Sequence, residues 1–340
     1  MTASASPEPI FVDLVRGALV ESRHRGAAAI VDASGRIVRS WGDIEQPVYP
    51  RSAVKPLQAL PLVESGAADA YGLGAVELAL SCASHHGQPI HVEAVTHWLD
   101  RVGLTPGDLE CGAHLPSDVA SAQALIRDGI APTAVHNNCS GKHSGFLSTA
   151  KHRGEATRGY IEADHPVQQR VIKALSEMTG LDLSRAPVGR DGCGIPVVGM
   201  SLHGMARGFA RMADPAGLHA ERRVAAVRLL DAMAAAPVMV DGATGMCHYV
   251  MSVAGAAVRL KGGAEGVYCA ALPAQGFGIA LKFEDGAARA AQLAMVTLLD
   301  RLGCFDADQH MALHPFLQPL LHNVAGIEVG ALRCTPAGDF

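Results

Sequence analysis

The sequence predicts an α/β fold of the α+β type, a sandwich in which terminal segments form an antiparallel sheet around a helical insert. Short apolar runs parted by glycine and proline occur near both ends of the chain, as in antiparallel strands. Between them, apolar residues recur at spacings of three and four, as in helices. No internal repeat, low-complexity tract or linker interrupts this pattern. Residues 1–340 are therefore expected to form a single domain.

The first predicted elements are a hairpin and a helix. Residues 27–31 and 36–41 are predicted to be antiparallel strands joined by a turn at 32–35. Pro50 disfavours helical geometry in the residue before it, and Ser52 is expected to cap a helix that runs to about Glu64. Ser52 would then lie at a junction between a loop and a helix.

Four more helices are predicted in the middle of the chain. Their apolar residues follow the spacing of a helix that packs on one face. They cover residues 89–102, 117–128, 166–179 and 220–235.

After residue 254 the apolar pattern changes from the helical period to short runs. Three such runs are expected to complete the sheet begun by the first hairpin: residues 255–260, 266–272 and 276–283. An amphipathic helix over 287–302 would then pack back over the sheet, followed by a helical stretch over 311–321.

Composition and charge limit the classes of function. The formal charge is −5 and no basic run exceeds two residues, which excludes the usual footprint of a nucleic-acid binder. No apolar run is long enough to span a membrane, and the first residues lack the pattern of a secretory signal. The eight cysteines are scattered and several lie in apolar segments, which favours reduced thiols in the cytoplasm. The expected partner is therefore a small molecule.

The first candidate for chemistry is the pair Ser52 and Lys55. Positions i and i+3 of a helix share a face, which brings the lysine amine within reach of the serine hydroxyl. Burial or a neighbouring cation such as Arg51 can lower the pKa of a lysine, and the neutral amine can then activate serine. The pattern S-x-x-K is also typical of a capping serine before a solvated lysine, so other segments must decide.

The second candidate is Lys261, which precedes two glycines between two predicted strands. In penicillin-binding proteins and serine β-lactamases, a K-T-G strand faces an S-x-x-K helix, with a further hydroxyl motif between them. Ser84 is the candidate for that hydroxyl, although it lies unusually close to Ser52 and no K-T-G is present. An amide is therefore a better expected substrate than a β-lactam. A surface lysine before a glycine turn is the alternative for Lys261.

Two polar, glycine-rich segments, residues 136–145 and 190–196, are expected to line a site. Such segments are costly to bury unless their polar groups find partners. Each carries a thiol, Cys139 and Cys193, and two thiols can hold zinc together with a further donor. Two buried free cysteines are the alternative.

Five segments together resemble the asparaginase II family, typified by the inducible rhizobial-type L-asparaginase. They are Ser52–Pro56, Ser81–Gly87, Asn137–His143, Gly189–Gly194 and Lys261–Gly266. They occur in the order of the family and cover most of the chain, whereas any one of them alone would be unspecific. The resemblance implies a fold similar to that of serine β-lactamases, a homodimer, and hydrolysis of L-asparagine to L-aspartate and ammonia.

The resemblance also implies roles for individual residues. The catalytic residues would be two Ser-Lys pairs, Ser52 with Lys55 and Ser84 with Lys261. Ser52 is the expected nucleophile and Lys55 its base. A zinc ion beside them would be held by Cys139, Lys142 and Cys193.

The candidates for substrate binding are Arg51, Asp191 and His143. The first two match the carboxylate and the amine of asparagine by charge. A related amidase or glutaminase is an alternative, because one methylene in a pocket discriminates by only about 1–3 kcal/mol. A zinc-dependent binding or sensor protein is another, in which the Ser-Lys pairs would be structural. Spatial separation of the serines from the lysines would favour the sensor.

Overall fold

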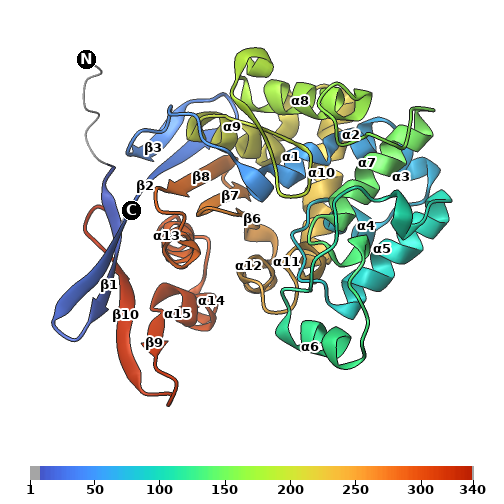
Figure 1. Ribbon diagram of the computed structural model, residues 1–340. Coiled ribbons are helices and arrows are strands. Elements are labelled where there is room, and N and C mark those ends of the chain that lie inside the picture. Colours follow the sequence, from blue (N-terminus) through green and yellow to red (C-terminus); the bar gives the residue numbers. More distant parts are fainter. Residues whose placement is uncertain (1–7, 339–340) are drawn as a thin grey trace, which may run out of the picture.

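The computed structural model describes residues 8–338, and its centre is an eight-stranded antiparallel sheet (Figure 1). The strand order is β6-β7-β8-β2-β1-β10-β9, with β3 paired to β2. The strands are β1 (Ile10–Arg16), β2 (Leu19–Asp32), β3 (Ile37–Trp41), β6 (Arg259–Gly263), β7 (Val267–Leu272), β8 (Phe277–Phe283), β9 (Leu320–His322) and β10 (Glu328–Cys334). Residues from both ends of the chain build this sheet, as predicted.

Residues 51–257, here called the helical insert, separate the two sets of strands. Its helices are α1 (Lys55–Gln58), α2 (Leu60–Glu64), α3 (Ala67–Ala70), α4 (Ala75–Ser81), α5 (Pro89–Val102), α6 (Val119–Arg127), α7 (Ser140–His152), α8 (Pro166–Thr179), α9 (Leu202–Ala213), α10 (Ala220–Ala235), α11 (Pro237–Asp241) and α12 (Met246–Ala254). The insert also contains a small hairpin of β4 (Val188–Arg190) and β5 (Pro196–Val198). Figure 1 shows the insert on one side of the molecule and the arm of β1, β10 and β9 on the other.

Helices cover both faces of the sheet. Helix α9 packs on β8, β2 and β7, while α13 (Ala288–Arg301) packs on the other side of β7 and β8 (Figure 1). A Cβ atom on Gly278 of β8 would lie 1.9 Å from the carbonyl oxygen of Ala206, so α9 can approach this closely only at a glycine. Two short helices, α14 (Ala307–Ala312) and α15 (His314–Leu317), lead to β9.

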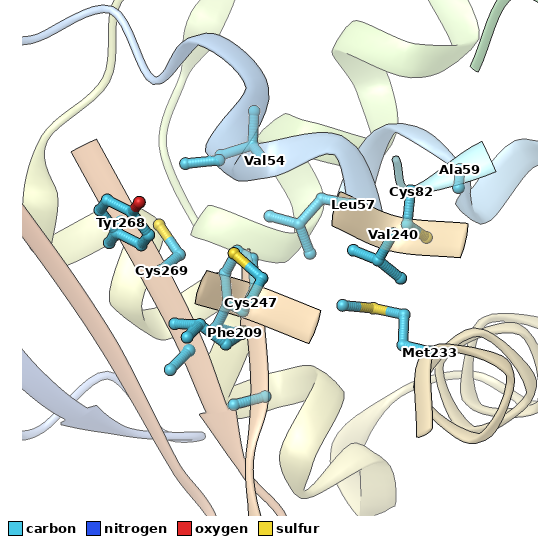
Figure 2. Close-up of a cluster of buried hydrophobic side chains, with 14 of the residues drawn as sticks. Val54, Leu57, Ala59, Cys82, Phe209, Met233, Val240, Cys247, Tyr268 and Cys269 are labelled. Atoms are coloured by element: carbon cyan, nitrogen blue, oxygen red, sulfur yellow. The ribbon is translucent and has the colours of Figure 1, made fainter. Parts of the chain in front are cut away.

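The hydrophobic core joins the insert to the sheet. Figure 2 shows Leu57 of α1 and Phe209 of α9 in one cluster with Cys269 of β7, and all three are fully buried. Truncating a large buried side chain typically lowers the free energy of unfolding by about 2–5 kcal/mol. This shared packing therefore holds the start of the insert in place against β6 and β7. No helix within residues 8–338 is long and apolar enough to cross a membrane.

Most predicted elements are confirmed. The hairpin of β2 and β3, the strands β7 and β8 and the long helix α13 lie where the apolar pattern placed them. The four central helices are α5, α6, α8 and α10, and three of them have the predicted bounds. Antiparallel pairing of β8 with β2 joins the later strands to the first hairpin.

Three predictions of local structure were wrong. The helix expected up to Glu64 is a 3-10 helix at Arg51–Val54 followed by α1 and α2, because prolines 56 and 61 lack the N–H group that continues a helix. Ser52 therefore lies inside the 3-10 helix, whose cap position is Pro50. The polar segment 136–145 is not all loop, since α7 begins at Ser140.

The stretch 311–321, expected to be helical, contains the end of α14 and all of α15, and only its last residues belong to strand β9, which begins at Leu320. The third error concerns the strand that was expected over residues 255–260. Residues 255–257 form a 3-10 turn, and strand β6 begins only at Arg259, so that Lys261 lies within the strand.

Candidate active site

A cavity of about 460 Å³ lies where the helical insert meets the end of β6. All five segments of the sequence pattern contribute to its wall, although they are spread over more than 200 residues of the chain. Its lining includes Arg51, Ser52, Ser84, His86, Asn138, Cys139, Asp191, Cys193, Asp241, Gly262 and Gly263. The convergence of these segments identifies the cavity as the candidate active site.

Backbone hydrogen bonds hold the segment of Ser84 in the cavity wall. The Ser84 N–H donates to the carbonyl oxygen of Val240 at 2.9 Å, and the His85 N–H donates to that of Asn138 at 3.2 Å. The side chains of Ser84 and His86 line the cavity, and His85 between them is fully buried. The segment is therefore anchored on both sides before its serine reaches the cavity.

His85 has a structural role that its partners define. Its Nδ1 accepts the N–H of Gly87 at 3.1 Å, so its Nε2 carries the proton that reaches Ser140 Oγ at 2.8 Å. Burial, with His91 stacked at 4.9 Å between ring centroids, holds the pKa of His85 well below its usual value. The neutral ring is thus fixed in one tautomer and cannot act as an acid in the cavity.

Lys55 is fully buried and points toward Ser84. Its Nζ donates to the carbonyl oxygen of Ala83, and lies 3.1 Å from both Ser84 Oγ and Cys139 Sγ. Burial is the main reason that the pKa of Lys55 falls to about 8, although the Cys139 thiol opposes the shift. A substantial neutral fraction of this amine is therefore present at slightly alkaline pH.

Lys261 reaches the same hydroxyl from the sheet. It is fully buried in β6, and its Nζ donates to Ser84 Oγ at 2.9 Å and to the carbonyl oxygen of Gly262 at 2.5 Å. A Cβ atom on Gly263 would lie 2.8 Å from the Ala53 nitrogen, so the glycine allows β6 to approach the segment of Ser52. The prediction that Lys261 and Ser84 lie together agrees with this geometry.

The expected contact between Ser52 and Lys55 is absent. Ser52 lines the cavity, but its hydroxyl makes no hydrogen bond to any of residues 8–338, and Lys55 turns to Ser84 instead. The backbone changes direction at Val54 (φ −95°, ψ 10°), where the 3-10 helix gives way to α1. The spacing of a continuous helix therefore does not apply to this pair, and both lysines contact one serine.

The three predicted metal ligands meet at the cavity wall, which Cys139 and Cys193 line. Lys142 Nζ lies 3.1 Å from Cys193 Sγ, and the Cys193 thiol is hydrogen bonded to Cys139. This hydrogen bond, together with the charges of Lys55 and Lys142, holds the pKa of Cys139 well below its usual value despite burial. Burial favours the neutral form of Lys142, but the two thiols outweigh it and raise its pKa.

Two sulfur atoms and one nitrogen form a donor set that suits zinc once the thiols and the Lys142 amine lose their protons, which a bound cation favours. No group of three histidine, cysteine or carboxylate side chains elsewhere in residues 8–338 is arranged to hold a metal. Close packing of α7 on α4 places the set, because a Cβ atom on Gly141 would lie 2.3 Å from the carbonyl oxygen of Leu80.

The candidates for substrate binding lie in different places. Arg51 and Asp191 both line the cavity and pair with each other, with Nε 2.8 Å from Oδ1. Burial acts to raise the pKa of Asp191, but the charges of Lys142 and Arg51 and the N–H of Gly192 together lower it. His143 lies outside the cavity lining, fully buried, with Nδ1 2.7 Å from the Tyr160 hydroxyl.

A family model described as L-asparaginase II matches residues 12–334. The chain belongs to the L-asparaginase II family. No curated protein matches the chain.

This L-asparaginase II chain is also similar to several solved structures. One is Mglu in its native form in 4.3 M NaCl, with 14% identity over 84% of this chain and 62% of that chain, and a TM-score of 0.41. Another is a β-lactamase from Mycobacterium bovis, with 14% identity, coverages of 86% and 94%, and a TM-score of 0.31. A third is D-alanine carboxypeptidase AmpC from Burkholderia cenocepacia, with 14% identity, coverages of 84% and 92%, and a TM-score of 0.34.

Sequence reasoning missed some polar residues that line the cavity of this L-asparaginase II chain. Asp241 ends α11, and His86 lies 3.9 Å from it, measured from Nε2 to Oδ1. Asp241 stands alone before a glycine, which indicates only a turn, so its sequence gives no sign of the cavity. His86 lies within the segment Ser81–Gly87, but the sequence assigned it no role in the site.

Proposed function

We propose that this chain is an L-asparaginase that hydrolyses L-asparagine to L-aspartate and ammonia through a lysine-activated serine. The observation that carries the proposal is the Ser84 hydroxyl, which lies in the cavity wall within hydrogen-bond distance of two buried lysine amines. Membership of the L-asparaginase II family supports a side-chain amide as the bond that is broken.

Lys55 is the general base for Ser84. Its neutral amine removes the hydroxyl proton while Oγ attacks the carbonyl carbon of the side-chain amide. The lowered pKa of about 8 makes the neutral form available near physiological pH, and the contact of 3.1 Å allows direct transfer. The proton then passes from Lys55 to the departing nitrogen, the C–N bond breaks, and ammonia leaves an acyl-enzyme.

Lys261 supports the same serine. Its contact of 2.9 Å with Ser84 Oγ holds the hydroxyl in place, and its charge contributes to the lowered pKa of Lys55. In the second half of the reaction, Lys55 takes a proton from water as the water oxygen attacks the acyl carbon. The proton returns to Ser84 Oγ, and L-aspartate is released.

Ser52 is the alternative nucleophile, because it lines the same cavity. In the arrangement described here it has no lysine to accept its proton, whereas Ser84 has two. We therefore assign attack to Ser84, and assign Ser52 to contact with the substrate.

Arg51 is proposed to bind the α-carboxylate of the substrate. Its Nε is held by Asp191, and its Nη atoms form no ion pair within residues 8–338. Asp191 therefore orients the guanidinium at the cavity wall. His143 is assigned an indirect role, because it supports Tyr160, whose oxygen accepts the N–H of Glu110 at 2.8 Å.

Zinc is proposed to bind at Cys139, Lys142 and Cys193, whose donor atoms already lie together. When bound, the ion would order the two segments that carry these ligands and polarise nearby groups of the substrate. The catalytic proton transfers are assigned to Ser84 and the lysines alone.

Two further proposals concern the whole protein. A homodimer is proposed from the family resemblance, and sedimentation velocity can distinguish one chain of 35.3 kDa from two. A cytoplasmic location is proposed because seven cysteines are buried thiols that form no disulfide bond. Reduced cysteines in cell extract, measured by thiol labelling without reductant, would support that location.

Ammonia release from asparagine and glutamine, measured side by side, tests the proposed function. We expect wild-type protein to prefer asparagine, and Ser84→Ala to lose turnover by on the order of 10³-fold or more while remaining folded. Ser52→Ala is the matched control and should retain more activity than Ser84→Ala. Release from neither amide by wild type would refute the proposal, and inactivity of Ser52→Ala alone would transfer attack to Ser52.

A further inference from the structure

Asp241 is a carboxylate in the cavity wall that has no lysine or arginine partner within residues 8–338. Its side chain is 16% exposed, and its Oδ2 accepts the N–H of Cys247 at 2.8 Å. Its Oδ1 faces His86 at 3.9 Å, and no lysine or arginine in the described part of the chain forms an ion pair with it. A partly buried charge in this position is costly unless a cation joins it.

Asp191, the other carboxylate of the cavity, is already paired. Arg51 Nε lies 2.8 Å from its Oδ1, the same oxygen accepts the N–H of Gly192, and the charge of Lys142 acts on it as well. These partners largely compensate the negative charge of Asp191. A cation that enters the cavity is therefore attracted more strongly to Asp241 than to Asp191.

The backbone holds Asp241 close to the reacting serine. Its neighbour Val240 accepts the N–H of Ser84 at 2.9 Å. The turn that follows wraps tightly around the carboxylate, because a Cβ atom on Gly245 would lie 2.3 Å from Asp241 Oδ2. A Cβ atom on Gly242, whose φ is +78°, would lie 2.9 Å from the His86 ring. The carboxylate is thus fixed beside the site of attack.

We propose that Asp241 binds the α-ammonium group of the amino-acid substrate. The inference rests on the proposed function and extends it to substrate selection. Arg51 would hold the α-carboxylate from the start of the insert, and Asp241 would hold the ammonium from the end of α11, with Ser84 next to it. The site therefore selects side-chain amides that carry a free α-amino group.

A comparison of two substrates with two proteins tests this inference. The substrates are L-asparagine and succinamate, which has the same amide and carboxylate but no amino group. Asp241→Asn keeps the size of the side chain and an acceptor for the Cys247 N–H, but removes the charge. We expect the variant to lose about tenfold or more in kcat/KM for asparagine, as for other hydrogen bonds to charged groups, and to leave kcat/KM for succinamate unchanged.

Product inhibition gives a second measurement that does not need turnover of succinamate. The inhibition constant of L-aspartate should rise in Asp241→Asn, and that of succinate should stay the same. Asp118→Asn is the matched control, because Asp118 caps α6 and lies outside the cavity lining, so it should change neither constant.

Equal losses with and without the amino group would show that Asp241 only supports α12, and would overturn the inference. Selective loss in Asp191→Asn, with none in Asp241→Asn, would overturn it as well. Failure of the proposed function itself is distinct, because it appears as wild-type protein that releases no ammonia from asparagine. Binding of aspartate and succinate, measured by calorimetry, would then still report on Asp241.

Discussion

The proposed chemistry depends on a lysine, Lys55, that is buried without a carboxylate beside it. The Nζ atom of Lys55 contacts a carbonyl oxygen, a hydroxyl and the Cys139 thiol. The Cys139 thiol, whose own pKa is lowered, favours the charged amine, but burial has the larger effect and favours the neutral amine. The same burial that is unfavourable for a charged lysine makes it available as a base.

The pH dependence of activity follows from Lys55. Its pKa is lowered to about 8, so the active neutral form increases as the pH rises through that value. We expect kcat/KM for asparagine to rise from pH 6.5 to pH 9 and to level off above it. A pH profile of initial rates checks this. A flat profile over the same range would contradict the assignment of Lys55 as base.

The metal ligands give a second prediction at the scale of residues. Wild-type protein should retain zinc, and Cys139→Ala and Cys193→Ala should lose it, because two of the three donors are thiols. Cys304→Ala removes another buried thiol and should keep the metal. Elemental analysis at several pH values should show weaker binding at low pH, since the ligands then regain protons.

Removing the metal from wild-type protein should raise KM before it lowers kcat, because the assigned proton transfers use Ser84 and the lysines. Steady-state kinetics after chelation checks this. Wild-type protein that holds no zinc when purified without chelator would contradict the metal site. Full loss of kcat with unchanged KM would contradict its supporting role.

Contacts between elements decide where the site lies, and α7 shows this most clearly. Alanine is better than glycine in a helix by about 1 kcal/mol, so Gly141→Ala would stabilise an isolated α7. In the protein, however, the new Cβ atom would meet the carbonyl oxygen of Leu80 at 2.3 Å, and backbone must shift. We expect the clash to win and to lower the free energy of unfolding by about 1–3 kcal/mol.

Gly145 on the same helix provides the matched control. A Cβ atom there would lie 3.4 Å or more from any neighbour, which is ordinary contact, so Gly145→Ala should be neutral or slightly stabilising. Urea unfolding of both variants measures the difference. If the two variants are equally stable, the spacing between α7 and α4 is not set by Gly141.

Sequence patterns predict a helix correctly when only one of its faces is buried, and they miss a helix that is buried on all sides. Helix α5 has an apolar face and an exposed face, so its period is visible and its bounds are predicted correctly. Helix α7 is buried over most of its length and contains serine, glycine and histidine, so it resembles a polar loop. Such a helix shows no apolar periodicity, because none of its faces is exposed to solvent.

The candidate site shows the same limit. The motifs identified many of the residues that line the cavity, but not all of the contacts between them. The spacing of Ser52 and Lys55 suggested a pair, whereas the break at Val54 sends the amine to Ser84. Asp241 could not be recognised, because its place in the cavity depends on the long-range contact of Val240 with Ser84.

At the scale of the whole molecule, the sheet closes the chain on itself. Strand β1 pairs with β10, so that Val12 lies opposite Cys334, and the helical insert leaves and re-enters the same sheet. Neither the insert nor the sheet has a core of its own, because the cluster of Leu57, Phe209 and Cys269 is shared between them (Figure 2). We therefore expect the two parts to fold as one cooperative unit.

The two tryptophans allow a direct test of this cooperativity. Trp41 lies on β3 in the sheet, and Trp98 is buried on α5 in the insert, where its indole N–H donates to Ser148 at 3.0 Å. Fluorescence of Trp98→Phe reports on the sheet, and that of Trp41→Phe reports on the insert. In each variant we expect the fluorescence and circular dichroism transitions in urea to coincide, as in two-state unfolding. An insert that melts at lower urea than the sheet would instead show two domains, with a catalytic cavity that is lost before the sheet unfolds.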